Sequence, residues 1–358
     1  MSSYERIAEL PLEVESLRFE GRELAFNEDF TRATTLIALR GPGGEAGVGE
    51  DVVYDGLDHV NLQMDGPGTI DLAGSYTVES FSKRLEQADL FPGAPPVRDT
   101  SRDYRRWAFE SAALDLALLQ AGRSLADVLE REPRPLNFVV SMRLGEWEQK
   151  GPEKPDRALR LLERYPGTKL KLDPTNNWTP ELVDVLVQTG AVDSLDLKGQ
   201  YKGTPVDVET DPELYRMVIE AFPNAWLEDP DVNDQTLPIL ERVTDRITWD
   251  APIHSVADVL DRPWRPKMVN IKPSRFGPLS RLFEMYDWCE AEGVQAYGGG
   301  QTELGPGRGH IQYLASLFHP DTPNDTAPSG YNEPQLPDGL PTSPLEPRIA
   351  PAGFRWQQ

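Results

Sequence analysis

The sequence has only one cysteine and four histidines in 358 residues. A single cysteine excludes an intramolecular disulfide, and the helix-like stretch around Cys289 indicates a packed side chain rather than a nucleophile. The histidines, His59, His254, His310 and His319, do not have the spacing of metal ligands, and His254 alone lies near a candidate site. We therefore do not expect a disulfide scaffold, a histidine zinc site or a cysteine enzyme.

Long apolar runs and an excess of positive charge are also missing. No run of about 18 apolar residues occurs, and the start "MSSYERIAELPLEVESL" lacks the basic and apolar segments of a signal peptide. The 59 Asp and Glu outnumber the 36 Lys and Arg, which gives a formal charge of -23. Such a field repels nucleic acid and anionic membranes, so we expect neither as a partner. We expect a cytoplasmic protein that its acidity keeps soluble.

From about residue 136, short apolar strands alternate with helices that carry clear start and stop signals. In "TPELVDVLVQTG", Thr179 predicts the N-cap, Pro180 the first helical position and Gly190 the end. Seven strand–helix units, with a further strand near "DTAPSGYN", favour a closed parallel barrel over an open sheet. The predicted fold class is α/β, a modified (β/α)7β TIM-type barrel, over residues 135–330. Its strands are expected in "LNFVVSMRLG", "TKLKLD", "VDSLDLKG", "AWLEDP", "RITWDAP", "KMVNIKPS" and "VQAYGGG".

Residues 1–134 form a different pattern, which predicts a separate α+β domain. "ATTLIALRG" and "GEAGVGEDVVY" predict antiparallel strands joined through "GPGG". "YRRWAFESAALDLALLQAG" predicts an amphipathic helix that stops at Gly122. The tail is rich in proline but ends in the apolar "RIAPAGFRW", so we expect residues 331–358 to pack back on this domain.

Charged residues recur at the ends of successive predicted strands. "TKLKLD" places Lys169, Lys171 and Asp173 on one face of its strand and the leucines on the other. The strand ends that follow carry Asp196, Glu228, Asp250 and Lys272. Consecutive members from Lys171 onward are 22 to 32 residues apart, close to one βα unit, so they should lie at similar heights around the mouth of the barrel. Barrel enzymes have their active sites at this end.

Three carboxylates that converge in a pocket repel one another unless a cation neutralises them. Their hard oxygen atoms suit Mg²⁺ or Mn²⁺, which can also bind a substrate carboxylate and stabilise the ene-diolate formed when the adjacent carbon loses a proton. Lys171 and Lys272 are the candidate bases. An ordinary lysine has a pKa of about 10.4, and a nearby divalent cation and second lysine would lower it. Lys169 is then a supporting cation.

These motifs resemble those of the enolase superfamily, in particular its muconate-lactonising subgroup, over residues 20–350 or so. "GVGE" and "ESAALDLALLQAGRSLADVL" are similar to the capping domain of that family. "KLK", "LEDP" and "NIKPSRFGPL" are similar to its second-, fourth- and sixth-strand motifs. "GGGQTELGPGRGHIQYLA" is similar to its seventh strand and the following helix, with Glu303 as a site residue in the turn.

The resemblance implies roles for particular residues. The implied Mg²⁺ ligands are Asp196, Glu228 and Asp250. Lys171 and Lys272 would face the two sides of a small carboxylate substrate. The capping domain, residues 1–134, would close over the barrel, with "FEGRELAFNEDFTR" as its specificity loop and Phe26 and Phe30 as its aromatic residues.

Two positions depart from the subgroup. Ala251 follows Asp250 where the subgroup usually has Glu, and Lys198 stands two residues after Asp196 where it usually has Asn. Lys198 adds a cation close to the metal. A competing register in "DPTNNW" would make Asp173 a ligand. We prefer Asp196, because every predicted strand and helix is then assigned to a place in the barrel.

The predicted function is Mg²⁺-dependent abstraction of the proton next to a carboxylate, followed by racemisation, epimerisation, cycloisomerisation or syn-elimination. One alternative is a Schiff-base enzyme that uses Lys171 or Lys272 as its nucleophile. Another is a binding protein with impaired metal binding, which Ala251 and Lys198 would favour. The sequence does not identify the substrate, and it does not decide whether the protein forms a homo-oligomer.

Overall fold

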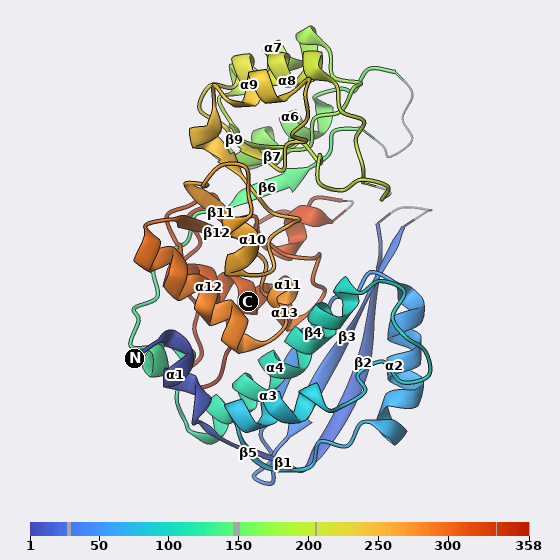
Figure 1. The fold of residues 1–358 in the computed structure, drawn as a ribbon, viewed down its shortest axis with the longest axis vertical. Helices are drawn as coiled ribbons and strands as arrows, with labels where there is room; N and C mark the ends of the chain where they lie inside the picture. Colours follow the sequence, from blue (N-terminus) through green and yellow to red (C-terminus); the bar gives the residue numbers. More distant parts are fainter. Residues whose placement is uncertain (27–29, 146–150, 205, 334, 358) are drawn as a thin grey trace.

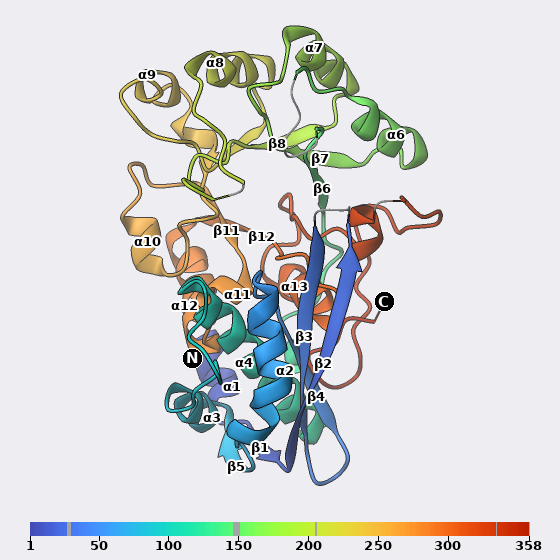
Figure 2. The same cartoon turned by 90° about the vertical axis from the view of Figure 1, so that its right-hand side faces the viewer.

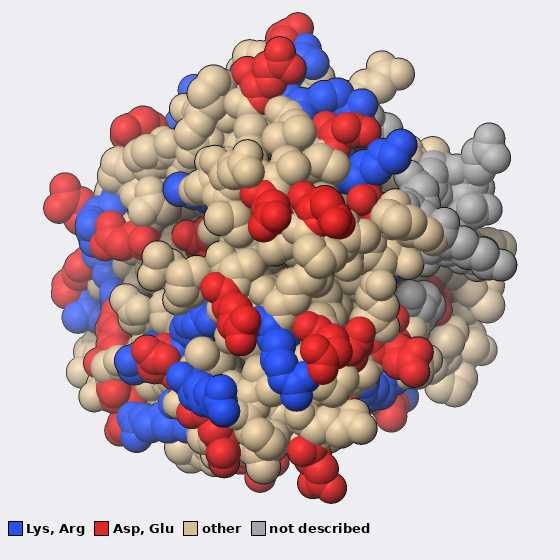
Figure 3. Space-filling model, turned by 90° about the horizontal axis from the view of Figure 1, so that it is seen from above, with Lys and Arg blue, Asp and Glu red and all other residues tan. Residues whose placement is uncertain are grey.

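The computed structural model of the protein describes residues 1–26, 30–145, 151–204, 206–333 and 335–357. Figures 1 and 2 show the first α+β part at one end of the molecule and strands β7–β9, with helices α6–α9, at the other. None of the described helices is long and apolar enough to cross a lipid bilayer. Seen from the α7–α9 end, acidic and basic side chains are interspersed on the surface (Figure 3).

The first part of the chain has an antiparallel sheet in the order β2–β3–β4, with the long helix α4 packed against it. Leu36 of β3 pairs with Glu50 of β4, which confirms the antiparallel strands predicted on both sides of "GPGG". The helix predicted before Gly122 is also confirmed, and Gly122 has the left-handed φ of 61° expected at a stop. The elements are α1 Ser3–Ala8, β1 Pro11–Val14, β2 Ser16–Ala25, β3 Thr31–Arg40, β4 Ala46–Asp51, α2 Gly56–Thr69, β5 Gly74–Thr77, α3 Val78–Glu86, α4 Thr100–Gln120 and α5 Leu125–Leu129.

Glycines in "GVGE" allow helix α4 to approach strand β4 closely. A Cβ atom on Gly47 would lie 2.2 Å from the carbonyl oxygen of Ala112, and one on Gly49 would lie 1.9 Å from that of Ala108. Both distances are far inside van der Waals contact, and the atoms met belong to the backbone of α4. The glycines are therefore needed for packing, and this motif holds the sheet and the helix together.

The second part is a closed barrel of parallel strands. Its parallel sheet runs in the order β10–β9–β8–β7–β6, and β11 pairs with β12. The strands are β6 Val139–Met142, β7 Lys169–Leu172, β8 Val192–Asp196, β9 Trp226–Glu228, β10 Ile247–Thr248, β11 Met268–Ile271 and β12 Gln295–Gly298. The helices are α6 Asp156–Arg164, α7 Pro180–Thr189, α8 Pro212–Ala221, α9 Leu237–Leu240, α10 Val256–Leu260, α11 Pro273–Phe276, α12 Leu279–Glu292 and α13 Pro306–Phe318, with 3₁₀ turns η1 Thr244–Arg246 and η2 Ser329–Asn332.

Two sets of backbone hydrogen bonds close the barrel. The N–H of Asn270 donates to the carbonyl of Trp249 at 2.9 Å, which links β11 to the end of β10. Residues 324–325 take the place of the further strand: Asn324 forms a parallel bridge with Phe138, and Asp325 forms one with Gly299. The predicted barrel is therefore confirmed, with its closing strand reduced to this short segment at the start of "DTAPSGYN".

Local signals in the sequence account for the helices around the barrel. Helix α7 begins where predicted: the Thr179 hydroxyl accepts from the Leu182 N–H, Pro180 is at the first position, and Gly190 ends the helix with a φ of 60°. The helix expected in "DQTLPILERV" is limited to α9, at Leu237–Leu240. Cys289 is buried in α12, and burial, with a smaller contribution from Glu290, raises the pKa of its thiol to about 12, as expected for a packed residue.

The end of the chain returns to helix α4. Phe354 packs edge-on against Trp107 with ring centroids 6.4 Å apart, and its N–H donates to the Asp115 carboxylate at 2.8 Å. Arg355 forms an ion pair with Asp115 at 3.0 Å. The tail thus contacts the first part of the molecule, while the division of the chain at residues 134 and 135 stays a prediction.

Candidate active site

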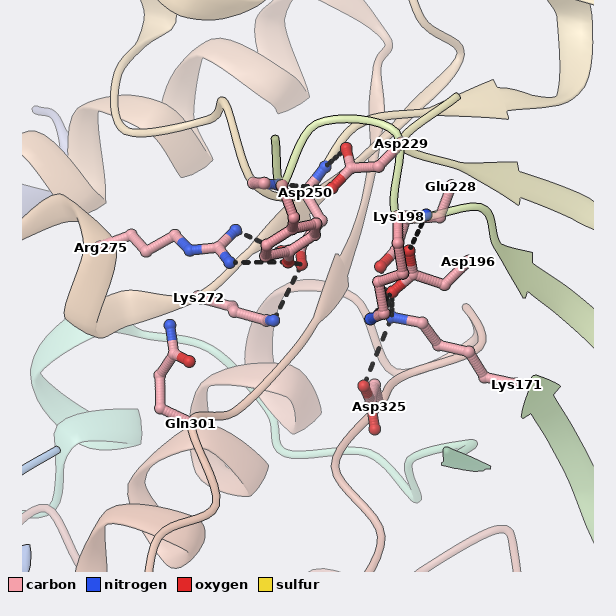
Figure 4. Close-up of polar contacts among 12 residues, drawn as sticks. Lys171, Asp196, Lys198, Glu228, Asp229, Asp250, Lys272, Arg275, Gln301 and Asp325 are labelled. Atoms are coloured by element: carbon pink, nitrogen blue, oxygen red, sulfur yellow. Dashed lines mark hydrogen bonds and ion pairs between the residues drawn. The ribbon is translucent and has the colours of Figure 1, made fainter. Parts of the chain in front are cut away.

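The carboxyl ends of the barrel strands bring together most of the charged residues that the sequence singles out (Figure 4). Lys171 lies on β7, Asp196 and Glu228 are the last residues of β8 and β9, and Asp250 and Lys272 follow β10 and β11. All five side chains are buried, and Lys272 is the most accessible at 8%. So much buried charge is costly unless the groups neutralise one another or serve a function.

One carboxylate cluster stands out at this end of the barrel. Among the described residues, Asp196, Glu228 and Asp229 each offer an oxygen within 4.8 Å of the others, which is close enough for one metal ion. Asp229 was not among the site residues expected from the sequence. Its backbone has a left-handed φ of 49°, and its carboxylate accepts the N–H groups of Asp250 and Ala251, each at 2.8 Å. The sequence feature that could have identified Asp229 is the pair of adjacent acids in "LEDP".

Lys171 is surrounded by carboxylates. Its amino group donates a hydrogen bond to Glu228 and lies 3.6 Å from an oxygen of Asp196 and 3.4 Å from an oxygen of Asp325. Burial alone would lower the pKa of Lys171, but Glu228, Asp325 and Asp196 together raise it well above its ordinary value. The lowered pKa expected from the sequence depends on a bound divalent cation and a second lysine, so it stays a prediction. In this arrangement Lys171 is an ammonium group.

Asp250 is occupied by donors from the opposite side of the site. Lys272 lies 2.9 Å from one of its oxygens, to which Tyr201 donates at 3.0 Å, and Arg275 donates to the other oxygen at 2.6 Å. Burial alone would raise the pKa of Asp250, but Arg275 and Lys272 hold it well below its usual range. Asp250 thus contacts Lys272 and Arg275 and lies outside the cluster of Asp196, Glu228 and Asp229, while its role as a metal ligand stays a prediction.

Arg275 and Tyr201 were not among the predicted site residues. Arg275 belongs to α11, three residues after Lys272, and its guanidinium also donates to the Tyr201 hydroxyl at 3.2 Å. Gly299 explains part of the "GGG" motif, since a Cβ atom there would lie 2.7 Å from the Cε atom of Lys272. The glycine leaves room for the lysine to reach Asp250.

Lys198 forms a second ion pair within the cluster. Its ammonium group donates to Asp196 and lies 3.6 Å from an oxygen of Asp173. Burial alone would raise the pKa of Asp196, but Lys198 and Lys171 hold it at about 2. Burial also raises the pKa of Asp173, and Lys198 partly offsets this effect.

Three other predicted residues lie apart from these contacts. Lys169 is exposed, and its amino group donates to the Gly190 carbonyl at 2.8 Å, so it does not act as the supporting cation expected beside Lys171. His254 lies within hydrogen-bond distance of the Ala251 and Arg275 carbonyls, 3.2 Å from each. Glu303 is buried and forms an ion pair with Arg308 at 3.1 Å.

The predicted specificity loop, residues 19–32, comprises most of β2, the start of β3 and the tip of the hairpin between them, which extends toward the barrel in Figures 1 and 2. The rings of Phe26 and Phe30 stack with centroids 5.7 Å apart, and the Phe26 N–H donates to the Phe30 carbonyl at 2.9 Å. Residues 27–29 of the loop lie outside the described residues. The two phenylalanines form an aromatic pair at the hairpin tip.

The charge balance of the site suits a divalent cation. Among the described residues, the wider site has six carboxylates, from Asp173, Asp196, Glu228, Asp229, Asp250 and Asp325, and four cations, from Lys171, Lys198, Lys272 and Arg275. With every group ionised, two negative charges remain. Burial, with smaller contributions from the charges of Asp250 and Asp196, raises the pKa of Asp229 to about 7. Asp196, Glu228 and Asp229 are thus a donor set that fits Mg²⁺.

Models of one family match most of the chain. The model described as the C-terminal domain of DUF8230, a domain of unknown function, matches residues 132–333, and that of the N-terminal domain matches residues 5–128. An N-succinylamino acid racemase of Thermus thermophilus is 25% identical over 346 residues, which cover 90% of this chain and 84% of that protein. An N-succinylamino acid racemase of Amycolatopsis is 30% identical over 183 residues, 47% of this chain, and the match spans only 46% of that protein.

Solved structures of low sequence identity are similar to most of the molecule. A dipeptide epimerase from Methylococcus capsulatus, complexed with Mg ion, has a TM-score of 0.65 and 18% identity, with 87% of this chain and 89% of that chain covered. The muconate lactonizing enzyme from Pseudomonas putida has a TM-score of 0.59 and 19% identity, with 85% and 83% covered. A Listeria innocua protein described as a member of the enolase superfamily has a TM-score of 0.62 and 18% identity, with 89% and 86% covered.

Proposed function

Because the chain belongs to the DUF8230 family and has the enolase-superfamily fold, with a capping domain and a TIM-type barrel, we propose that it is a divalent-metal-dependent racemase or epimerase of N-acylated amino acids. The observation that carries the proposal is the pair Lys171 and Lys272, which enter the site from β7 and from the end of β11 and contact Glu228 and Asp250, respectively. The N-succinylamino acid racemases and the dipeptide epimerase support the substrate class.

The positions of the two lysines suit proton transfer between the two faces of one carbon. Strand β7 is followed in the barrel by β8, β9 and β10 before β11, so Lys171 and Lys272 approach from opposite sides. In Figure 4 their amino groups point toward each other across the space bounded by Asp250, Asp196 and Asp325. An α-carbon held between them would lose its proton to one amine and receive a proton from the ammonium group on the other face.

The surrounding groups prepare this exchange. The contacts of Lys171 with Glu228, Asp325 and Asp196 hold its amino group at the site. Asp250 orients Lys272, and Tyr297 donates to Glu228 and fixes that carboxylate. A divalent cation held by Asp196, Glu228 and Asp229 would supply the positive charge that stabilises the negative charge developing on the substrate carboxylate.

Proton exchange with solvent tests this function directly. In D₂O with MgCl₂, we expect the α-proton signals of N-succinyl amino acids to disappear from the NMR spectrum while the enantiomers interconvert. N-acetyl amino acids and dipeptides complete the substrate panel, and EDTA should stop the exchange. Lack of exchange with the whole panel would contradict the proposal. Exchange that survives EDTA, together with trapping of a lysine adduct by borohydride, would favour a Schiff-base enzyme instead.

A further inference from the structure

Lys198 is a partly buried cation that the proposed reaction does not use. We propose that Lys198 competes with the divalent cation for Asp196, and that its ammonium group transfers to Asp173 when the cation binds. This inference rests on the proposed metal site, because Asp196 belongs both to the carboxylate cluster and to the ion pair with Lys198. The consequence is a metal affinity that a single internal lysine weakens.

The backbone around Lys198 is fixed, so the side chain alone has to move. Lys198 has a left-handed φ of 53°, and its N–H donates to the Asp196 carboxylate at 3.2 Å. The next N–H, that of Gly199, donates to the Asp229 carbonyl at 2.8 Å. A Cβ atom on Gly199 would lie 2.1 Å from the backbone nitrogen of Asp231, so this loop packs directly on the chain after β9. Left-handed backbone in a residue other than glycine is costly and is often found at functional sites.

Asp173 is placed to receive the ammonium group. One of its oxygens lies 3.6 Å from the Lys198 amino group, just beyond hydrogen-bond length. Its other oxygen is buried and has no hydrogen-bond partner among the described residues. The Tyr201 ring, whose centroid is 5.2 Å from the amino group, offers a further favourable contact. The amino group of Lys198 thus lies close to a second carboxylate that can replace Asp196 as its partner.

Electrostatics requires such a move. Lys198 and Lys171 already share one oxygen of Asp196, and a divalent cation on that carboxylate would repel both ammonium groups at short range. Lys171 keeps Glu228 and Asp325 as partners, whereas Lys198 has Asp173 as its other carboxylate. Asp173 is not in the cluster of Asp196, Glu228 and Asp229, so an ammonium group paired with it leaves those ligands to the metal.

Calorimetric titration of the full chain with MgCl₂ tests the exchange. We expect Lys198→Met to bind Mg²⁺ about 10-fold more tightly than the wild type, because no ammonium group has to be displaced. Asp173→Asn should bind it about 10-fold more weakly, because Lys198 then has no second partner. The double variant should match Lys198→Met, since Asp173 acts only through the lysine.

Two further variants keep the test decisive. Lys202→Met removes an exposed lysine from the same loop and should leave Mg²⁺ affinity unchanged. Lys198→Arg keeps the charge, and its affinity for Mg²⁺ should stay within about twofold of the wild type; it provides the comparison if Lys198→Met does not fold.

Mg²⁺ binding by the wild type with no gain in affinity in Lys198→Met would overturn this inference and leave the metal site intact. Weakening by Asp173→Asn that persists without Lys198 would also overturn it. Absence of Mg²⁺ binding in all variants would instead overturn the proposed metal site, and the inference with it.

Discussion

Lys171→Ala and Lys272→Ala are each expected to lower kcat/KM for racemisation by about 10²- to 10⁴-fold, the usual loss when a general acid or base is removed. Racemisation needs both amines, because one removes the proton and the other returns it on the opposite face. The two positions lie on strands that face each other across the barrel, so neither lysine can replace the other.

The two variants should also differ in a way that a structural defect would not produce. Each retains one amine, so each should still exchange the α-proton of one enantiomer with D₂O, and the two should prefer opposite enantiomers. NMR with separate D- and L-substrates measures this preference. Lys169→Ala is the matched control, because Lys169 lies on the same strand as Lys171 but is exposed and bonded to the Gly190 carbonyl. The same preferred enantiomer in both variants would contradict the assignment of one lysine to each face.

Glu228→Gln is expected to weaken Mg²⁺ binding on the order of 100-fold or more, because it removes a charged oxygen ligand from a buried cluster. The replacement keeps the shape of the side chain and an oxygen that can accept from Tyr297. Glu303→Gln is the matched control, since Glu303 is also buried but is paired with Arg308. Titration calorimetry measures the affinities, and thermal unfolding shows that both variants are folded.

Asp250→Asn tests which third acid binds the metal with Asp196 and Glu228. The structural cluster contains Asp229, whereas the sequence resemblance implies Asp250. Asp250 is held by Lys272, Arg275 and Tyr201, so its replacement should leave Mg²⁺ affinity within a few fold of the wild type. It should, however, reduce the proton exchange that depends on Lys272, because the amine loses its anchor. Loss of Mg²⁺ binding as large as that in Glu228→Gln would restore Asp250 to the ligands in place of Asp229.

The sequence predicts the barrel well because the signals for it are local. The two ends of helix α7 are specified locally, by Thr179, Pro180 and Gly190. Strand ends that are one βα unit apart lie at similar heights in the barrel. This spacing is why the positions at the ends of five strands meet in the structure. The position of Lys169 was not predicted, because alternation gives the face of a strand but not the height. Lys169 lies two residues before Lys171 and therefore about 7 Å lower on the strand.

The contacts that the sequence did not reveal depend on backbone turns and on distant residues. Alternation sends adjacent side chains to opposite faces, so Glu228 and Asp229 were not expected in one cluster; the left-handed turn at Asp229 brings both inward. Arg275 reaches Asp250 from the helix after the next strand. The raised pKa of Lys171 results in part from Asp325, which is 154 residues away in the chain. These contacts join residues that are distant in the sequence, so they form only in the folded barrel.

The most direct test of the account is a crystal structure of the protein soaked in Mn²⁺, with the ion located by its anomalous scattering. We predict one strong site bounded by Asp196, Glu228 and Asp229, with the amino groups of Lys171 and Lys272 on opposite sides of the space beside it. An ion that binds Asp250 in place of Asp229, or a site at which no Mn²⁺ binds, would contradict the account.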